Sequence, residues 1–228
     1  MIIPDLELIN DFKRTPGAIS VAEAFGIYNL ITNREPVKEG CFIDVGSNAG
    51  KSSMMAAAAL SANGSTGDFH LIDPVYNPDI KEWQRWAYAA NNDSFVNKVF
   101  DTVSKHSDLD FIINGMFSTE FLSAHKTPLN YVFIDSGDHE SVLLKKELDM
   151  IVPLMKEGAL IIFHDFGNQF FDVVNAANNL VDQGFKRVEI DWESIREYVK
   201  SNRLEDGNDS WHIFEGNYCP SFIGALTK

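Results

Sequence analysis

The sequence has little cysteine, few basic side chains and no long apolar run, and each shortage excludes a class of protein. Its two cysteines, Cys41 and Cys219, are too few and too far apart for a disulfide framework or a zinc-ligand cluster. No apolar run is long enough to span a bilayer. The first residues lack the basic start and apolar core of a signal peptide, so we expect a cytoplasmic protein.

Basic residues are outnumbered, with 19 Lys and Arg against 33 Asp and Glu and a formal net charge of −14. General nucleic-acid binding depends on Lys and Arg that neutralise phosphates, and no basic stripe is present. We therefore expect no nucleic-acid partner and no attachment to a membrane surface. The composition leaves a homo-oligomer open.

The chain of 228 residues has the length and the apolar content of one domain, spanning 1–228. Strand-like and helix-like segments alternate from 41 to 185, which predicts an α/β fold with a parallel sheet between helices. Residues 1–40 are expected to form an N-terminal arm (1–16) followed by a helix at 19–32. The polar and aromatic insertion at 77–93 is a candidate lid.

The helix expected at 19–32 has a clear beginning. Ser20 and Glu23 have the spacing of a capping box, in which each side chain accepts a hydrogen bond at the start of the helix. Apolar residues at helical spacing, from Val21 to Ile31, predict that one face of this helix is buried.

A glycine loop follows the first strand-like run, with Asp44, Gly46 and Gly50 in the pattern Asp-x-Gly-x-x-x-Gly. A phosphate-binding P-loop needs four residues between its glycines, and this loop has three. A dinucleotide-binding loop needs a third glycine, which is missing. The pattern therefore favours an adenosyl ligand without phosphates over ATP, GTP or a nicotinamide dinucleotide.

A second apolar run ends at Asp73, which lies 23 residues after Gly50. In nucleotide-binding α/β folds an acid at an offset of about 20 residues binds the ribose diol. Asp73 is also suited to cap a turn before Pro74. We favour the ribose role, because the glycine loop lies at the matching distance upstream.

Two further strand-like runs end in polar residues, one at Asp135 and one at His164 and Asp165. Ligands of open parallel sheets bind beyond the carboxyl ends of the strands. These side chains should therefore converge with Asp44 and Asp73 at one edge of the sheet. The helix between the two runs should bury its leucines, and we expect a solvated face made of Lys145, Lys146, Glu147 and Asp149.

Together these segments resemble the class I S-adenosylmethionine-dependent methyltransferases, in the small-molecule O-methyltransferase branch of the methyltransferase-24 type. The resemblance covers about residues 15 to 166, and its second half is carried by Asp138-His139, Glu147-Leu148, Gly158 and His164-Asp165. The family usually has Asp-Gly-Asp-His where this chain has Asp-Ser-Gly-Asp-His, one residue longer. Either Asp135 or Asp138 could thus take the role of the first acid.

The resemblance implies a Rossmann-like, doubly wound α/β fold. Its mostly parallel seven-stranded sheet would have helices on both faces and an antiparallel C-terminal strand. It also implies S-adenosylmethionine as the cofactor. The residues expected to bind it are Asp44, Gly46, Ser47, Asn48, Gly50, Ser52, Asp73, Met116, Phe117 and Asp135.

Methyl transfer to an oxygen requires that the acceptor lose a proton. A general base is one route, for which we expect His139, His164 or Asp135. A divalent cation such as Mg²⁺ is another, and for it the resemblance implies Asp135 or Asp138, together with Asp165, as ligands.

The acceptor expected from the resemblance is a small molecule or a sugar, methylated on oxygen. The sequence does not distinguish an oxygen acceptor from a nitrogen acceptor. The main rival is a catalytically silent binding module or partner subunit with the same fold. Trp83 and Trp86, inside the candidate lid, could cover the substrate or pack on the domain.

Overall fold

The computed structural model describes residues 1–80, 92–135, 141–167, 170–205 and 223–228. The strands are β1 (Gly40–Val45), β2 (Gly67–Ile72), β3 (Asp110–Asn114), β4 (Leu129–Ile134), β5 (Met155–Phe163), β6 (Lys186–Val188) and β7 (Gly224–Thr227). The α-helices are α1 (Leu6–Arg14), α2 (Val21–Thr32), α3 (Lys51–Ala62), α5 (Asn92–Ser104), α6 (Ser118–Ala124), α7 (Ser141–Ile151), α8 (Phe171–Asp182) and α9 (Trp192–Ser201). Short 3-10 helices cover Pro74–Tyr76 (η1) and Val152–Leu154 (η2).

The described strands form one seven-stranded sheet in the order β3-β2-β1-β4-β5-β7-β6. β1 pairs in parallel with β2 and β4, and β7 is antiparallel to both of its neighbours, β5 and β6. From β1 the chain adds β2 and then β3 on one side, and it adds β4 and then β5 on the other side. The strand order therefore reverses between β1 and β4. Ligands bind at such a switch point in open α/β sheets. The mostly parallel seven-stranded sheet and its antiparallel C-terminal strand confirm the expected fold.

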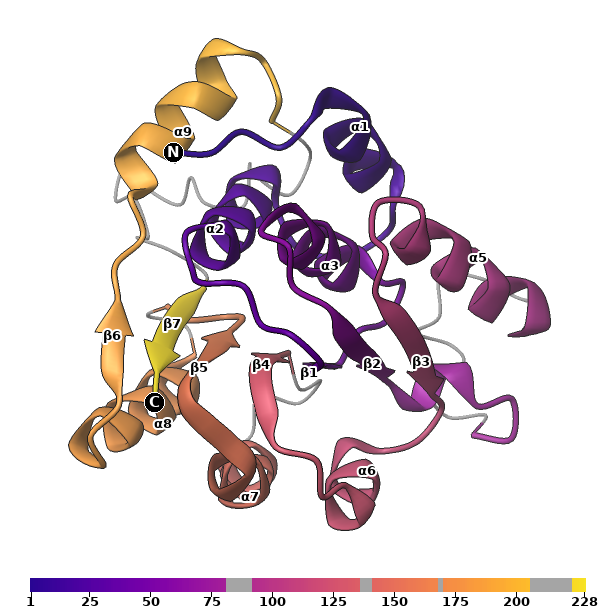
Figure 1. Cartoon of the computed structure of the whole chain (residues 1–228), viewed down its shortest axis with the longest axis vertical. Helices are drawn as coiled ribbons and strands as arrows, with labels where there is room; N and C mark the ends of the chain where they lie inside the picture. The colour runs from indigo at the N-terminus through magenta and orange to yellow at the C-terminus, as the bar shows by residue number, and fades with distance from the viewer. Residues whose placement is uncertain (81–91, 136–140, 168–169, 206–222) are drawn as a thin grey trace.

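Helices cover both faces of the sheet (Figure 1). Helices α1, α2, α3, α5 and α9 lie on one face, and α6, α7 and α8 lie on the other. Each face has its own apolar core, and β1 is buried along its whole length. Strands covered on both faces are expected to be apolar throughout. The burial of the acidic residue Asp44 within β1 must therefore be explained by its local contacts.

The N-terminal residues expected to form an arm contain a helix. Residues Leu6–Arg14 fold as helix α1, which Asp5 caps by accepting a hydrogen bond from the backbone N–H of Leu8 at 2.8 Å. Leu8, Ile9 and Phe12 are buried against the rest of the protein. The sequence alone did not identify this helix, because the apolar stripe of a short helix has a partner only in the folded chain.

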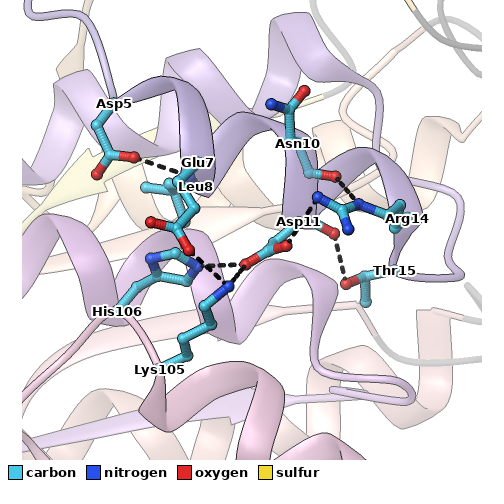
Figure 2. Close-up of polar contacts among 9 residues, drawn as sticks. All are labelled: Asp5, Glu7, Leu8, Asn10, Asp11, Arg14, Thr15, Lys105 and His106. Carbon is cyan, nitrogen blue, oxygen red and sulfur yellow. Dashed lines mark hydrogen bonds and ion pairs between the residues drawn. The ribbon is translucent and has the colours of Figure 1, made fainter.

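A group of charged side chains ties α1 to the residues that follow α5 (Figure 2). Asp11 accepts hydrogen bonds from Lys105 at 2.6 Å and from His106 at 2.9 Å. Lys105 also contacts Glu7 at 2.8 Å, and Arg14 contacts Asp11 at 3.3 Å. These contacts fix the helix that leads into residues 16–19, which reach the candidate site.

Helix α2 begins as predicted. The capping box is present, with Ser20 and Glu23 each accepting a hydrogen bond from the other's backbone. Its burial exceeds the prediction, because every residue from Val21 to Ile31 is buried and not one face alone. The reason is that α2 packs against α1, α3 and α9. No helix in the described part of the chain is long and apolar enough to cross a membrane.

Candidate active site

A pocket of about 390 Å³ opens beyond the carboxyl ends of β1, β2 and β4. Binding sites for small molecules commonly measure about 300–1,000 Å³. The walls come from six parts of the chain: residues 16–19, the loop and helix start at 45–52, residues 72–75, Phe117 and Ser118, Asp135, and the α7 residues Leu143 and Glu147. The pocket thus lies at the switch point of the sheet.

Gly46 allows the loop after β1 to approach the end of β4. Its φ is +79°, and a Cβ atom at this position would lie 1.9 Å from the backbone oxygen of Asp135. The backbone N–H of Asp135 donates to the carbonyl oxygen of Val45 at 2.9 Å. Because Gly46 has no side chain, the loop can pack against the backbone of Asp135, a residue that lines the pocket.

Asp44 lies beneath the glycine loop and is fully buried. One of its oxygens accepts hydrogen bonds from the hydroxyls of Ser52 at 2.7 Å and Ser53 at 2.5 Å. Burial raises the pKa of Asp44 to about 7. Neither Asp44 nor Gly50, the left-handed N-cap of α3, lines the pocket. Their position suits them to hold the loop and not to touch a ligand.

Asp73 lines the pocket and also caps the turn after β2. Its two carboxyl oxygens accept from the backbone N–H groups of Val75 and Asn48, each at 2.9 Å. Burial raises its pKa. The capping interpretation of the sequence is thus confirmed. Each carboxylate oxygen can accept more than one hydrogen bond, so a ribose role is compatible with this geometry and stays a prediction.

The glycine loop is further fixed by Tyr76, which the sequence analysis did not identify. The Tyr76 hydroxyl donates to the carbonyl oxygen of Asn48 at 2.6 Å and lies 2.9 Å from the hydroxyl of Ser47. Ser47, Asn48 and Ser52 all line the pocket. Because Tyr76 is 28 residues from Asn48 in sequence, no local pattern announces the contact.

The residues after β3 divide between core and pocket. Met116 is partly buried and packs against the apolar core on the side of α6, α7 and α8, whereas Phe117 lines the pocket and is 43% exposed. The sequence did not distinguish the two, and of them only Phe117 lies at the pocket.

Glu147 corrects an expectation. It is completely buried, lines the pocket, and accepts a short hydrogen bond from the hydroxyl of Ser118 at the start of α6. Its predicted companions on a solvated face, Lys145, Lys146 and Asp149, are exposed. The expectation was wrong because α6 covers this turn of α7 and supplies a polar partner there.

His164 lies among carboxylates at the ends of β4 and β5. Its Nδ1 is 3.3 Å from Asp135 and 3.2 Å from Asp165, and its Nε2 is 3.5 Å from Glu23 of α2. Although burial disfavours the charged ring, the carboxylates, Asp135 foremost, raise the pKa of His164 well above its usual value. His164 does not line the pocket, so this environment suits a fixed cation better than a base.

Asp135, His164 and Asp165 also form the metal-ligand cluster found among the described residues. Each offers one ligand atom, and these atoms lie within 4.8 Å of one another. Two residues expected at the same place, Asp138 and His139, fall outside the described residues. So do Trp83 and Trp86 and most of the candidate lid.

The strand order, the glycine loop under a pocket and the acids at three strand ends define a class I methyltransferase fold. The methyltransferase-24 family model, described as a methyltransferase domain, matches residues 43–166. This is more than half of the chain, so the protein belongs to this family of S-adenosylmethionine-dependent methyltransferases. No curated protein sequence matches the chain significantly.

Solved structures share the fold at low sequence identity. The N-methyltransferase NodS from Bradyrhizobium japonicum WM9 is 10% identical with a TM-score of 0.53, over 96% of this chain and 97% of that one. The O-methyltransferase TomG from Streptomyces achromogenes, in complex with SAM, is 14% identical with a TM-score of 0.51, over 100% and 92%. An O-methyltransferase from Bacillus cereus, in complex with SAH, is 12% identical with a TM-score of 0.52, over 100% and 94%.

Proposed function

We propose that this protein binds S-adenosylmethionine in the pocket at the switch point and transfers its methyl group to an oxygen of a small molecule or sugar. The observation that carries the proposal is the pocket itself. It is of ligand size, it lies over the glycine loop, and Asp73, Asp135 and Glu147 contribute carboxyl groups to its lining. Such a lining suits a ligand that carries a sulfonium, an ammonium and a ribose diol.

The residues present fit the parts of the cofactor. Asp73 is available to the ribose hydroxyls, and Phe117 offers an aromatic face to the adenine. Gly46, Ser47, Asn48 and Ser52 would hold the amino-acid end. Asp44 and Gly50 would act indirectly, by holding the loop in place.

Methyl transfer from a sulfonium is a direct displacement, so the protein must align the acceptor with the S–CH3 bond and exclude water. The acceptor hydroxyl must also lose its proton. Asp135 is the described carboxylate best placed to take it, because its side chain is 26% exposed and lines the pocket. His164 lies beside it, with its Nδ1 at 3.3 Å from the Asp135 carboxyl group.

A divalent cation is the second candidate route, favoured by the cluster of Asp135, His164 and Asp165. These residues would hold the ion, with the His164 ring neutral in that state, and the ion would lower the pKa of a bound hydroxyl. Two oxygen ligands suit Mg²⁺, and one imidazole also suits a transition metal. Titration with Mg²⁺ and with Mn²⁺ alone, before and after chelation, tests this route.

The oxygen preference rests on the resemblance of the second half of the chain to O-methyltransferases, since the similar folds include an N-methyltransferase as well. Incubation with labelled S-adenosylmethionine and a panel of hydroxylated, sugar and amine acceptors would test it. Labelled products among the amines alone would contradict an oxygen acceptor.

Calorimetric titration with S-adenosylhomocysteine tests the function most directly. We expect micromolar binding that weakens at least about tenfold in Asp73→Asn, which loses the carboxylate charge and one of the two oxygens that accept from the backbone of Val75 and Asn48. Asp149→Asn, an exposed acid on α7, is the matched control and should bind as the wild type does. No binding by the wild type would contradict the proposal, and binding without turnover of any acceptor would favour the silent module.

A further inference from the structure

Lys51 is the one cationic side chain among the described residues that line the pocket. The lining otherwise carries the three carboxyl groups of Asp73, Asp135 and Glu147. Lys51 is only 5% exposed, although lysines are seldom buried to this extent. The pocket therefore combines one buried cation with three carboxyl groups.

Contacts from two other segments hold Lys51 against the pocket wall. Its stem packs on Gly17, where an added Cβ would lie 3.1 Å from Lys51 Cδ. Its ammonium lies over the ring of Phe12, at 4.4 Å from the centroid. Phe12 is fully buried in α1. A cation is attracted to the face of an aromatic ring, and an alkyl stem packs well on apolar surface, so the side chain is preorganised.

The backbone around Lys51 adds positive potential. Lys51 is the first residue of α3, a helix of 12 residues, and its N-cap Gly50 makes no side-chain hydrogen bond to the first turn. The N-terminus of a helix carries a partial positive charge and favours anions. The charge of Lys51 and the helix dipole thus act at the same end of the pocket.

The charges of the pocket and of the cofactor can be matched group by group. S-adenosylmethionine has a sulfonium, an ammonium and a ribose diol, which suit carboxylates, and it has a single carboxylate, which suits a cation. We propose that Lys51, supported by the N-terminus of α3, recognises the carboxylate of the cofactor and thereby selects adenosyl amino acids over adenosyl amines. This inference rests on the proposed function, because it assumes that the adenosyl cofactor occupies this pocket.

Two probes that differ only in the carboxylate test the inference by calorimetry. One is S-adenosylhomocysteine and the other is its decarboxylated analogue, an adenosyl thioether of 3-aminopropanethiol. We expect the wild type to bind the first about 10- to 100-fold more tightly, as for one charged hydrogen-bonding contact. Lys51→Met should lose most of this preference by weakening the first probe alone, whereas Lys51→Arg should retain it.

Lys98→Met is the matched control, since Lys98 is an exposed lysine of α5 outside this pocket. It should leave both affinities unchanged. Equal affinity of the wild type for the two probes would overturn the inference while supporting the proposed function. An equal loss for both probes in Lys51→Met would overturn it too, because it would indicate a structural role. Binding of neither probe by the wild type would refute the proposed function as well.

Circular dichroism and thermal melting establish whether each variant folds. Should Lys51→Met not fold, Lys51→Gln provides a second neutral side chain with shorter apolar reach. The comparison of the two probes in the wild type and in Lys51→Arg decides the question without any neutral variant, since loss of the preference in a folded Lys51→Arg would overturn the inference.

Discussion

Gly46 lies where the loop after β1 comes closest to the end of β4. A methyl group there would meet the Asp135 oxygen at 1.9 Å, and the φ of +79° already disfavours other residues. We expect Gly46→Ala to lower the free energy of unfolding by at least about 2 kcal/mol, since overpacking adds to the left-handed strain. Urea denaturation measures it.

Gly158→Ala separates the effect of overpacking from the effect of left-handed backbone strain. Gly158 has nearly the same φ, +75°, and nothing lies within 4 Å of an added Cβ. It should cost only about 1 kcal/mol, the price of a left-handed alanine. Equal losses in the two variants would show that the approach to Asp135 is not what requires glycine.

Asp44 makes the stability depend on pH. Burial raises its pKa from 3.8 to about 7, so between these values the folded protein holds a proton that the unfolded chain has lost. Its contribution to stability is therefore greatest at low pH, falls as pH rises from about 4 to about 7, and is then constant. Asp44→Asn should flatten this part of the profile, because the amide oxygen still accepts from Ser52 and Ser53 without titrating.

Urea denaturation of the wild type and Asp44→Asn at pH 4.5 and pH 8 tests this effect. The variant should gain stability relative to the wild type at the higher pH. The control is Asp149→Asn, an exposed acid paired with Lys145. Parallel profiles for Asp44→Asn and the wild type would mean that Asp44 does not titrate in this range.

At the scale of elements, helix α1 depends on its contacts with the segment after α5 (Figure 2). Hydrogen bonds from Lys105 and His106 lower the pKa of Asp11, so its ionised form is the stabilising one. We expect Asp11→Asn to speed amide hydrogen exchange in α1, with a loss of about 1 kcal/mol or less, since the contacts are partly exposed.

High salt should reduce the difference between Asp11→Asn and the wild type, because ions screen exposed charges. Asp149→Asn breaks the exposed pair with Lys145 in α7 and should leave exchange in α1 unchanged. Unaltered exchange in Asp11→Asn would indicate that Leu8, Ile9 and Phe12 hold α1 by apolar contact alone.

At the scale of the whole molecule, β7 closes the sheet by inserting between β5 and β6. Leu226 of β7 is 1% exposed and belongs to the core shared with β5, α7 and α8. Leu226→Ala should therefore cost about 2–5 kcal/mol in chemical denaturation, as for other buried leucines. Leu6→Ala, at a leucine 64% exposed in α1, should change stability by less than about 0.5 kcal/mol. Similar losses in both would mean that β7 is not integral to the fold.

Much of the site could be predicted from the sequence wherever the signal was local. The strand, glycine loop and helix of residues 41–60 lie close together in the chain, as do Ser20 and Glu23 of the capping box. Each uses a spacing that itself determines which groups can meet. The alternation of strands and helices and the family resemblance then sufficed to predict a mostly parallel seven-stranded sheet with an antiparallel C-terminal strand.

Only the tertiary structure decided which side chains face the pocket. The sequence pattern placed Glu147 on a solvated face, and it gave no role to Lys51 or Tyr76. All three residues are buried at or beside the site. Met116 and Phe117 are adjacent in sequence and lie in different places. The physical reason is that burial and hydrogen-bond partners come from segments far away in the chain. The partner of Glu147 is on α6, that of Lys51 is on α1, and those of Tyr76 are in the glycine loop.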